Sequence, residues 1–283
     1  MRPIATLSMS LEASQITASE SELFQAILSD TADEVVAVNL DGEQLTVLVE
    51  TIGGLSEPPA VRSLVKDSVA RWLQDDFLVA SAVADEMAAG NLSLRTAEVR
   101  FENTLLVTGE TVVSVVPAGD RVAGLATDDE DFVATTREKW NSEWNDATEV
   151  SFRTPPRSEI HESLANEIGE EVDADFRAML NSVETTRDKG ALNEVGMSLL
   201  AAANNEIQLF EISKWGEDTG LASRATYSRT KTQLEDSGLL ATEKVPMDVG
   251  RPRLRLLLGE ELRGVDVDDL VEQAQKMMVA APA

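Results

Sequence analysis

The sequence contains no cysteine, so disulfide bridges, cysteine-ligated zinc sites and thiol nucleophiles are excluded. It has one histidine and lacks both the phosphate loop G-x-x-x-x-G-K-S/T and the dinucleotide motif G-x-G-x-x-G. No run of residues approaches the ~20 apolar positions of a membrane span, and Met1–Ser10 lacks the apolar core of a signal peptide. We therefore expect a soluble, cytoplasmic protein with no membrane partner, no catalytic residues and no cofactor, and no pattern points to a metal ion.

Basic residues are scarce in this chain. Its 24 Lys and Arg, of which only seven are Lys, stand against 51 Asp and Glu and give a net charge of −27. An acidic, lysine-poor surface stays hydrated in molar salt, where the Debye length falls to ~3 Å and self-repulsion is screened. The composition favours a halophilic protein over an ordinary acidic cytosolic one.

The hydrophobic pattern divides the chain into five parts. Residues 1–18 have no helical or strand period and are predicted to be a disordered tail. Residues 19–154 mix short strands with helices, which predicts an α/β domain. After Pro155-Pro156, residues 155–189 form two amphipathic helices that serve as a linker or as a dimerisation seam. Residues 190–264 form a second domain, and residues 265–283 a helix that either pairs with its copy or packs back on its own domain.

Within the α/β domain, the segments Glu34–Leu40 and Gln44–Thr51 both have the apolar pattern of strands. Pro58 and Pro59 predict the start of a helix that runs towards Trp72, and a second helix follows at about Asp75–Ala89. Further strands are predicted at Leu92–Val99, Thr104–Val107, Thr111–Val116 and Arg121–Thr127. The acidic run Asp128–Asp131 is typical of the start of a helix, because acidic side chains complement the helix dipole.

The one basic region is Ala222–Leu257, where seven Lys and Arg meet four acidic residues. Two apolar helices precede it, at Glu194–Ala203 and Leu209–Asp218, and Thr219-Gly220-Leu221 supplies a tight turn. A third helix then runs from Ala222 to Asp236. The segments Leu239–Val245 and Arg253–Leu258 follow it as a hairpin. This succession of helices, turn, basic helix and basic hairpin is typical of a winged helix-turn-helix that binds double-stranded DNA.

The predicted DNA contacts lie on the third helix and on the hairpin, called the wing. Hydroxyl and guanidinium groups near a helix N-terminus suit base edges and phosphates in the major groove, and arginines on one face of a strand suit the backbone or minor groove. Arg224 and Arg229 are the expected base readers, whereas Tyr227 faces inward with only its hydroxyl near a phosphate. The full set is Ser223, Arg224, Thr226, Tyr227, Ser228, Arg229, Lys231 and Thr232 on the helix, with Arg251, Arg253 and Arg255 in the wing.

A sugar-phosphate effector would need basic residues at strand ends of the α/β sheet. Arg62, Arg71, Arg95 and Arg121 are the candidates, although each can instead pair with a surface acid. The single histidine, His161, stands beside Glu162 on a predicted helix. We expect it to be a surface residue and not a catalytic base.

Ser213–Leu240 (SKWGEDTGLASRATYSRTKTQLEDSGLL) and Thr242–Gly259 (TEKVPMDVGRPRLRLLLG) resemble the haloarchaeal winged-helix regulators of the TrmB-suppressor (TbsP) type. The resemblance continues upstream through DDFLVASAVADEMAAGNLSLRT and LLVTGETVVSVVPAGDRVAGLATDDEDFV, so it covers nearly everything from about Glu20. It implies a DNA-binding homodimer that controls central sugar metabolism, including gluconeogenesis.

Leu105–Phe132 also resembles the phospholipase-D-like sensor domain of sugar-responsive TrmB-type regulators. Enzymes of that superfamily use a His and Lys pair in each half-site. His161 lies outside this segment and has no Lys two residues later. The resemblance therefore implies a sensor domain that binds a sugar or phosphosugar and does not cleave it.

Two other functions stay open. The α/β domain of a DNA-binding or chromatin-associated protein could serve only for protein contacts, or the chain could be a small-molecule enzyme whose winged helix docks on other proteins. Basic residues on both third helix and wing favour the DNA-binding functions. A metabolite that raises the melting temperature would separate a sensor from a contact domain.

Overall fold

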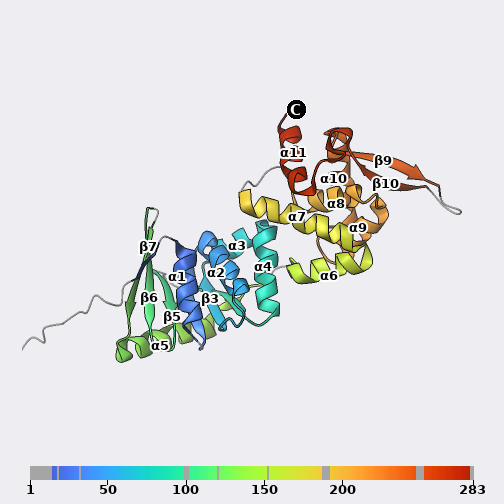
Figure 1. Cartoon of the computed structure of the whole chain (residues 1–283). Helices are drawn as coiled ribbons and strands as arrows, with labels where there is room; N and C mark the ends of the chain where they lie inside the picture. Colours follow the sequence, from blue (N-terminus) through green and yellow to red (C-terminus); the bar gives the residue numbers. More distant parts are fainter. Residues whose placement is uncertain are drawn as a thin grey trace, which may run out of the picture. The chain divides into compact units, whose positions relative to one another are not determined.

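The computed structural model describes residues 15–280 except for 18, 32, 99–101, 120, 152, 187–191 and 247–251. The chain forms two compact units, residues 1–152 and 153–283 (Figure 1). Part of the predicted disordered tail is ordered, because Gln15–Thr17 forms strand β1 and pairs with a strand of the first unit. The rest of the tail lies outside the described residues.

The described residues of the first unit form one mixed sheet of eight strands. Besides β1, the strands are β2 (Val35–Leu40), β3 (Val61–Val65), β4 (Leu92–Thr96), β5 (Thr104–Val107), β6 (Val112–Ala118), β7 (Arg121–Thr127) and β8 (Thr148–Glu149). Their order in the sheet is β1-β7-β6-β5-β2-β3-β4-β8. Strands β2, β3 and β4 run parallel, and the pairs on either side of them are antiparallel.

Helices cover both faces of this sheet (Figure 1). They are α1 (Glu20–Ser29), α2 (Gly42–Gly54), α3 (Asp67–Asp75), α4 (Phe77–Ala88) and α5 (Glu130–Asp146). Successive side chains of a strand point to opposite faces. Val35 and Ala37 therefore join the core beneath α1–α4, while Val36 and Val38 pack with Trp140 of α5. The α/β architecture predicted for this part of the chain is confirmed.

Two predicted elements of the first unit are wrong. Gln44–Thr51 lies in helix α2 and not in a strand, because Asp41 and Gln44 form a capping box and Leu45, Leu48 and Ile52 are buried at helical spacing. The helix predicted to start at Pro58-Pro59 is preceded by strand β3. That strand has apolar residues on both faces, and α3 begins only after it, at Asp67.

The second unit contains the predicted winged helix-turn-helix. Gly220 and Gly238 follow the ends of α9 (Leu209–Asp218) and α10 (Arg224–Asp236) with φ of +80° and +72°, values that glycine adopts without strain. The hairpin is antiparallel, with Arg253 opposite Val245 and Arg255 opposite Glu243. The elements are α6 (Arg157–Glu167), α7 (Glu170–Thr186), α8 (Glu194–Asn204), α9 (Leu209–Asp218), α10 (Arg224–Asp236), β9 (Leu240–Val245), β10 (Arg253–Leu258), a short 3₁₀ turn (Glu260–Leu262) and α11 (Val267–Ala280).

The helices predicted as a linker, α6 and α7, belong to the second unit. Helix α7 packs against α8 and α11, and its Phe176 and Leu180 are buried. Helix α6 contacts α9, where Trp215 Nε1 donates a hydrogen bond to Ser163 Oγ over 3.0 Å. The final helix packs back on its own domain, with Leu270 and Val271 buried.

His161 of α6 is buried, which corrects the prediction of a surface residue. Its Nδ1 lies 2.6 Å from Asp173 Oδ1 of α7, while Arg177 Nε lies 2.7 Å from the other oxygen of that carboxylate. Burial lowers the pKa of His161 and outweighs the hydrogen bond to Asp173, which raises it. A neutral imidazole that donates from Nδ1 therefore joins α6 to α7.

Candidate nucleic-acid interface

The position of α10 is set by close packing against α9. Tyr227 of α10 lies over Gly216 of α9, where an added Cβ would sit 2.2 Å from the tyrosine Cε2. Ser223 caps the helix by accepting a hydrogen bond from the Thr226 amide over 3.2 Å. At the other end Leu234 is buried. These contacts turn one face of α10 inward and leave the opposite face to solvent.

Tyr227 is fully buried, so the predicted phosphate contact through its hydroxyl is wrong. The hydroxyl lies 3.1 Å from Ser198 Oγ of α8. Burial raises the pKa of Tyr227, and the neutral phenol stays in the domain interior. Its role is to pack α10 against α8 and α9.

The position of Lys231 also does not fit its predicted contact with DNA. Only 13% of its side chain is exposed, and Nζ lies 2.6 Å from Glu235 Oε2. Thr242 of β9 donates to the other oxygen of Glu235 over 2.8 Å. Burial opposes the ionisation of Glu235, but these hydrogen bonds prevail and lower its pKa. Glu235 therefore joins α10 to the hairpin, and the charge of Lys231 is paired within this contact.

The solvent face of α10 carries the other predicted residues. Ser223, Arg224, Ser228, Arg229 and Thr232 are exposed, and Thr226 is half-buried. The Thr232 hydroxyl donates to the Ser228 carbonyl over 3.1 Å. Within the part of the chain that the structure describes, Arg229 has no ion-pair partner. Its guanidinium is thus available to a nucleic acid.

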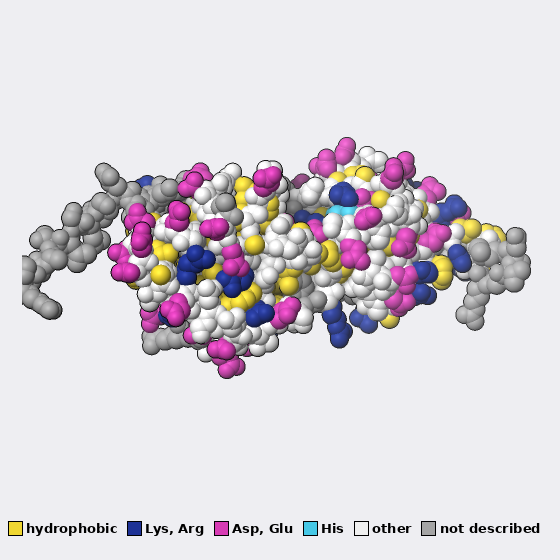
Figure 2. All heavy atoms as spheres, turned by 90° about the horizontal axis from the view of Figure 1, so that it is seen from below, with side chains coloured by type: hydrophobic (Ala, Val, Ile, Leu, Met, Phe, Trp, Pro, Cys, Tyr) yellow, Lys and Arg dark blue, Asp and Glu magenta, His cyan; other side chains and the backbone are white. Residues whose placement is uncertain are grey.

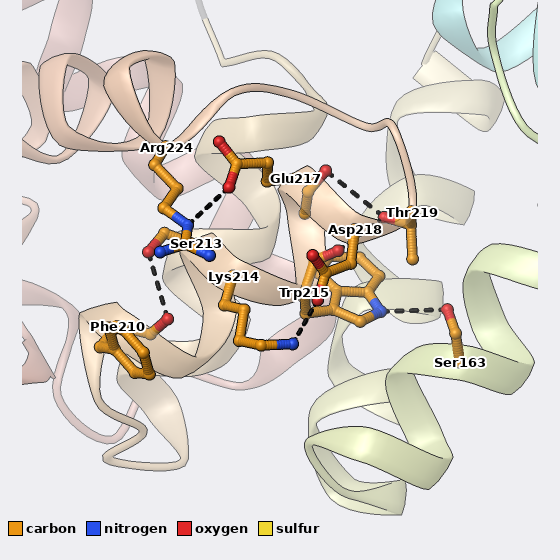
Figure 3. Close-up of polar contacts among 10 residues, drawn as sticks. Ser163, Phe210, Ser213, Lys214, Trp215, Glu217, Asp218, Thr219 and Arg224 are labelled. Atoms are coloured by element: carbon orange, nitrogen blue, oxygen red, sulfur yellow. Dashed lines mark hydrogen bonds and ion pairs between the residues drawn. The ribbon is translucent and has the colours of Figure 1, made fainter.

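Acidic side chains alternate with the basic ones around this face. Figure 2 shows Lys and Arg gathered on the second unit, on the side of the β9–β10 hairpin, with Asp and Glu between them. Arg224 Nε lies 2.7 Å from Glu217 of α9 (Figure 3). Arg255 lies between Glu206 and Glu243, at 3.8 and 3.7 Å. The free protein therefore neutralises part of its own basic face.

The wing presents Arg253 and Arg255 on one face of β10, as predicted. Arg253 Nη1 donates to Gln208 Oε1 over 3.3 Å. Arg251 lies outside the described residues. Lys244 of β9 was not among the predicted contacts, yet it is exposed and has no ion-pair partner in the described chain.

Phe210 of α9 was also not predicted, and it is 42% exposed beside the arginines. The guanidiniums of Arg224 and Arg253 lie 5.6 and 4.4 Å from the centre of its ring. A pattern of apolar residues treats Phe210 and Ile212 alike, but residues two apart on a helix lie about 200° apart around its axis. Because Ile212 is buried, this angular separation predicts from the sequence that Phe210 lies on the exposed side of α9.

The four arginines predicted for a sugar phosphate do not converge. Arg62 and Arg95 lie 5.4 and 4.7 Å from the Trp144 ring, and Arg95 donates to the Trp144 carbonyl over 2.8 Å. Arg62 also donates to Asn141 over 2.7 Å and pairs with Glu34. These two arginines hold α5 on the sheet, whereas Arg71 is exposed on α3 and Arg121 begins β7.

The first unit has a pocket of about 470 Å³ between the end of α1, the β5–β6 turn and the end of β7. Leu23, Ile27 and Val113 contribute apolar surface to it. No Lys or Arg occurs among its described lining residues, which include the carboxylates of Asp30, Asp33, Glu110 and Asp128. Carboxylates accept hydrogen bonds from hydroxyl groups but repel a phosphate. The pocket thus suits a neutral polyol.

The described residues contain neither a membrane-spanning helix nor a group of metal ligands. None of the helices in that part of the chain is long and apolar enough to cross a membrane. No three His, Cys, Asp or Glu side chains of the described ranges are grouped so that they could hold a metal ion.

Both units match families of known proteins. Residues 156–275 match the family described as transcriptional regulator TbsP-like, C-terminal HTH domain. Residues 12–155 match the family described as transcriptional regulator TbsP-like, N-terminal. No curated protein gives a significant match.

Three solved structures are similar over about half of the chain. TrmBL2, an archaeal chromatin protein described as having a novel mode of DNA binding, is 19% identical with a TM-score of 0.36, over 51% of this chain and 57% of its own. Nuc from Salmonella typhimurium, a phospholipase D family member, is 13% identical with a TM-score of 0.35, over 48% and 97%. NucT from Helicobacter pylori is 6% identical with a TM-score of 0.32, over 48% and 98%. Similarity at these TM-scores assigns neither fold nor function.

Proposed function

This chain belongs to the TbsP-like transcriptional regulators, and from that premise we propose that it binds operator DNA as a homodimer through α10 and the β9–β10 hairpin. Arg229 carries the proposal. Its side chain is exposed on the outer face of the reading helix and has no carboxylate partner among the described residues. A free guanidinium at this position can bind a guanine edge through two hydrogen bonds.

In the proposed complex, two copies of α10 enter successive major grooves. Winged and related helix-turn-helix dimers place their reading helices about 34 Å apart, one turn of the duplex. Arg253, Arg255 and Lys244 then face the backbone or minor groove beside each half-site. The expected operator is an imperfect palindrome, because the two half-sites follow the twofold symmetry of the protein.

We propose that the regulated genes belong to central sugar metabolism, including gluconeogenesis, and that the protein works in the cytoplasm of a halophile. The resemblance of Ser213–Leu240 and its flanking segments to haloarchaeal regulators supports the first point. The net charge of −27 supports the second, since molar salt screens the repulsion within so acidic a chain.

The effector proposed here is a neutral sugar and not a phosphosugar. The pocket of the first unit offers four carboxylates and the threonine hydroxyls of its rim, and the described lining contains no cation for a phosphate. In this proposal the first unit binds the sugar and does not cleave it, because the single histidine, His161, is buried in the other unit and bound to Asp173.

A melting experiment on the full chain tests the effector. Glucose or fructose should raise the melting temperature, their 6-phosphates should not, and Asp33→Asn with Asp128→Asn should weaken the response to the neutral sugar. A rise with the phosphates alone would contradict a neutral effector.

An alternative role for the first unit is protein contact. Leu125 and Phe132 are 50% and 53% exposed, and Val116 is 39% exposed on the strand next to Leu125. Exposed apolar side chains on neighbouring elements favour a surface that a partner covers. Two results together would favour this role. No sugar would raise the melting temperature, and a protein partner would be found that no longer binds when Leu125 is replaced.

Genome-wide immunoprecipitation tests the regulator itself. The tagged protein should give discrete promoter peaks that change with sugar in the medium, and Arg229→Ala should abolish them. Arg121→Ala, which removes an exposed arginine of the first unit, is the matched control and should keep them. The absence of peaks for the wild type in either medium would contradict the proposed function.

A further inference from the structure

A pocket of about 250 Å³ opens between α9, α10 and the start of β10. It is lined by Leu209, Phe210 and Ser213 from α9, Arg224 and Ser228 from α10, and Pro252, Arg253 and Leu254 from the wing. The pocket therefore lies where the reading helix and the wing meet. Arg224, Ser228 and Arg253 are among the predicted DNA contacts, but no role has been assigned to Phe210 or to the pocket as a whole.

Phe210 lies against both arginines of this pocket. Its ring stays 42% exposed although two guanidiniums lie against it, that of Arg224 at 5.6 Å and that of Arg253 at 4.4 Å. The two arginines come from different elements, α10 and β10. One aromatic ring thus fixes the spacing between a cation of the reading helix and a cation of the wing.

Both arginines have further polar partners that keep the guanidiniums in place. Glu217 of α9 binds Arg224 over 2.7 Å (Figure 3), and Gln208 binds Arg253 over 3.3 Å. Each contact leaves other N–H groups of the guanidinium free to donate, since a guanidinium has five. The pair is held in place before any ligand arrives.

The chemistry of the pocket fits a phosphate joined to an apolar ring. Guanidinium groups bind phosphate oxygens through paired hydrogen bonds, and the Ser228 hydroxyl supplies a further donor. The ring of Phe210 and the side chains of Leu209 and Leu254 offer apolar surface to a sugar. A bare anion would leave that apolar surface unused.

We propose that this pocket receives one deoxyribose-phosphate unit of the DNA backbone, with Phe210 against the sugar and Arg224 and Arg253 on the phosphate. The inference rests on the proposed function and deepens it. It moves Arg224 from base reading to backbone binding, and it makes Phe210 a positioning residue for both arginines. The pocket fixes the angle at which α10 meets the major groove.

The test uses the full chain and a duplex that the wild type selects from a random library, with a scrambled duplex beside it. Phe210→Leu should weaken binding to both duplexes by about five- to tenfold, because the two guanidiniums are then no longer held in place before DNA arrives and must be ordered on binding. A backbone contact carries no sequence information, so both duplexes lose equally. Phe210→Tyr keeps the ring and should bind like the wild type.

Phe77→Leu is the matched control, because Phe77 is half-buried in the first unit and belongs to none of the proposed binding surfaces. It should leave both affinities unchanged. The melting temperatures of all variants establish that they fold. Ethylation of single phosphates in the selected duplex then locates the contact. In each half-site, ethylation of one phosphate should prevent binding of the wild type but should not change the affinity of Phe210→Leu.

The outcomes separate this inference from the proposed function. Wild-type affinity of Phe210→Leu for both duplexes would overturn the backbone pocket while leaving the regulator intact. Failure of the wild type to select any duplex from the random library would overturn the proposed function itself. If glucose 6-phosphate at constant ionic strength raises the melting temperature of the wild type but not of Phe210→Leu, and no ethylated phosphate distinguishes the two proteins, the pocket is a site for a free phosphate ester.

Discussion

Carboxylates divide the basic residues of the DNA-binding face into two groups. Arg224 and Arg255 each pair with a glutamate, whereas Arg229, Lys244 and Arg253 have no acidic partner in the described chain. A paired cation must exchange one anion for another when DNA binds, and the freed carboxylate then lies close to phosphates. The unpaired cations bind DNA without that exchange, so they are the residues whose loss should matter most.

Arg229→Ala should weaken binding to the selected duplex by about 1–3 kcal/mol, the cost of a lost bidentate contact with a base. Binding to scrambled DNA should change far less. Fluorescence titration of both duplexes measures this, with Arg121→Ala as the control. An equal loss on the two duplexes would move Arg229 from base reading to backbone contact.

The buried pair of His161 and Asp173 predicts a dependence of stability on pH. Burial lowers the pKa of His161 below its ordinary value of 6.5, so the unfolded chain binds a proton at pH values where the folded chain does not. The contribution of His161 is therefore complete above about pH 6.5. It is lost as the pH falls from there through the pKa of the folded state.

Urea unfolding at pH 7.5, 6.5 and 5.5 measures this effect. The free energy of unfolding of the wild type should fall between the first and last pH more steeply than that of His161→Gln. The comparison of slopes removes the constant cost of losing the hydrogen bond to Asp173. Parallel slopes would show that His161 keeps its ordinary pKa in the folded protein.

Single residues were the least predictable feature of the candidate site. Helical spacing placed Tyr227 inward correctly, but its hydroxyl partner, Ser198, lies 29 residues earlier in the chain. Lys231 is bound to Glu235 together with Thr242, which comes from the hairpin. Such partners come from different elements, and a sequence pattern within one element contains no information about them.

Packing between α9 and α10 depends on one glycine. A Cβ at Gly216 would lie 2.2 Å from Tyr227 Cε2 and 2.4 Å from the tyrosine hydroxyl, and the buried ring has no free space to move into. Gly216→Ala should therefore destabilise the second unit by about 1–3 kcal/mol, as overpacked cores do. It should also lower DNA affinity through the displaced α10.

Urea unfolding compares Gly216→Ala with Gly54→Ala. Gly54 ends α2, and nothing lies within 4 Å of its added Cβ. Its replacement should be neutral or stabilise by up to about 1 kcal/mol, because alanine loses less backbone entropy in a helix. Equal stability of both variants and the wild type would show that α9 and α10 adapt to the extra methyl group.

Elements with a local stop signal were predicted well. Gly220 and Gly238 mark the ends of α9 and α10, and their positive φ explains why glycine occupies both positions. Helix α2 was mistaken for a strand because Thr46, Val47, Val49 and Thr51 are β-branched residues with high strand propensity. The capping box of Asp41 and Gln44 was the signal that outweighed this propensity.

Across the whole molecule, the paired cations predict a weak dependence of DNA binding on salt. Each phosphate neutralised by a cation ordinarily contributes about −0.9 to the slope of log affinity against log salt. Here Arg224 and Arg255 are partly neutralised before DNA arrives, so the slope should be shallower than the number of phosphate contacts implies. The double variant Glu206→Gln, Glu243→Gln frees Arg255 and should make this slope steeper. Glu149→Gln, which lies in the first unit, should leave the slope unchanged. Equal slopes for all three proteins would contradict the prediction.

The division into two units followed from Pro155-Pro156, close to the boundary between residues 152 and 153. The sequence pattern did not predict that α6 and α7 belong to the second unit. An amphipathic pattern reveals an apolar stripe but not the surface that covers it, and here α8, α9 and α11 cover it. Phe176 is thus buried in the second unit and Ser163 bonds Trp215 of α9, although neither looked different from a residue of a linker.

The extent of the second unit leads to a prediction about fragments. A fragment of residues 153–283 retains α6 and α7 and should unfold cooperatively and bind the selected duplex. A fragment of residues 190–283 exposes Trp215 and Leu200 and removes Phe176, which costs several kcal/mol of buried apolar surface in a domain of marginal stability. It should therefore lack a cooperative transition. Circular dichroism during heating compares the two, and a cooperative transition in the shorter fragment would make α6 and α7 a separable linker after all.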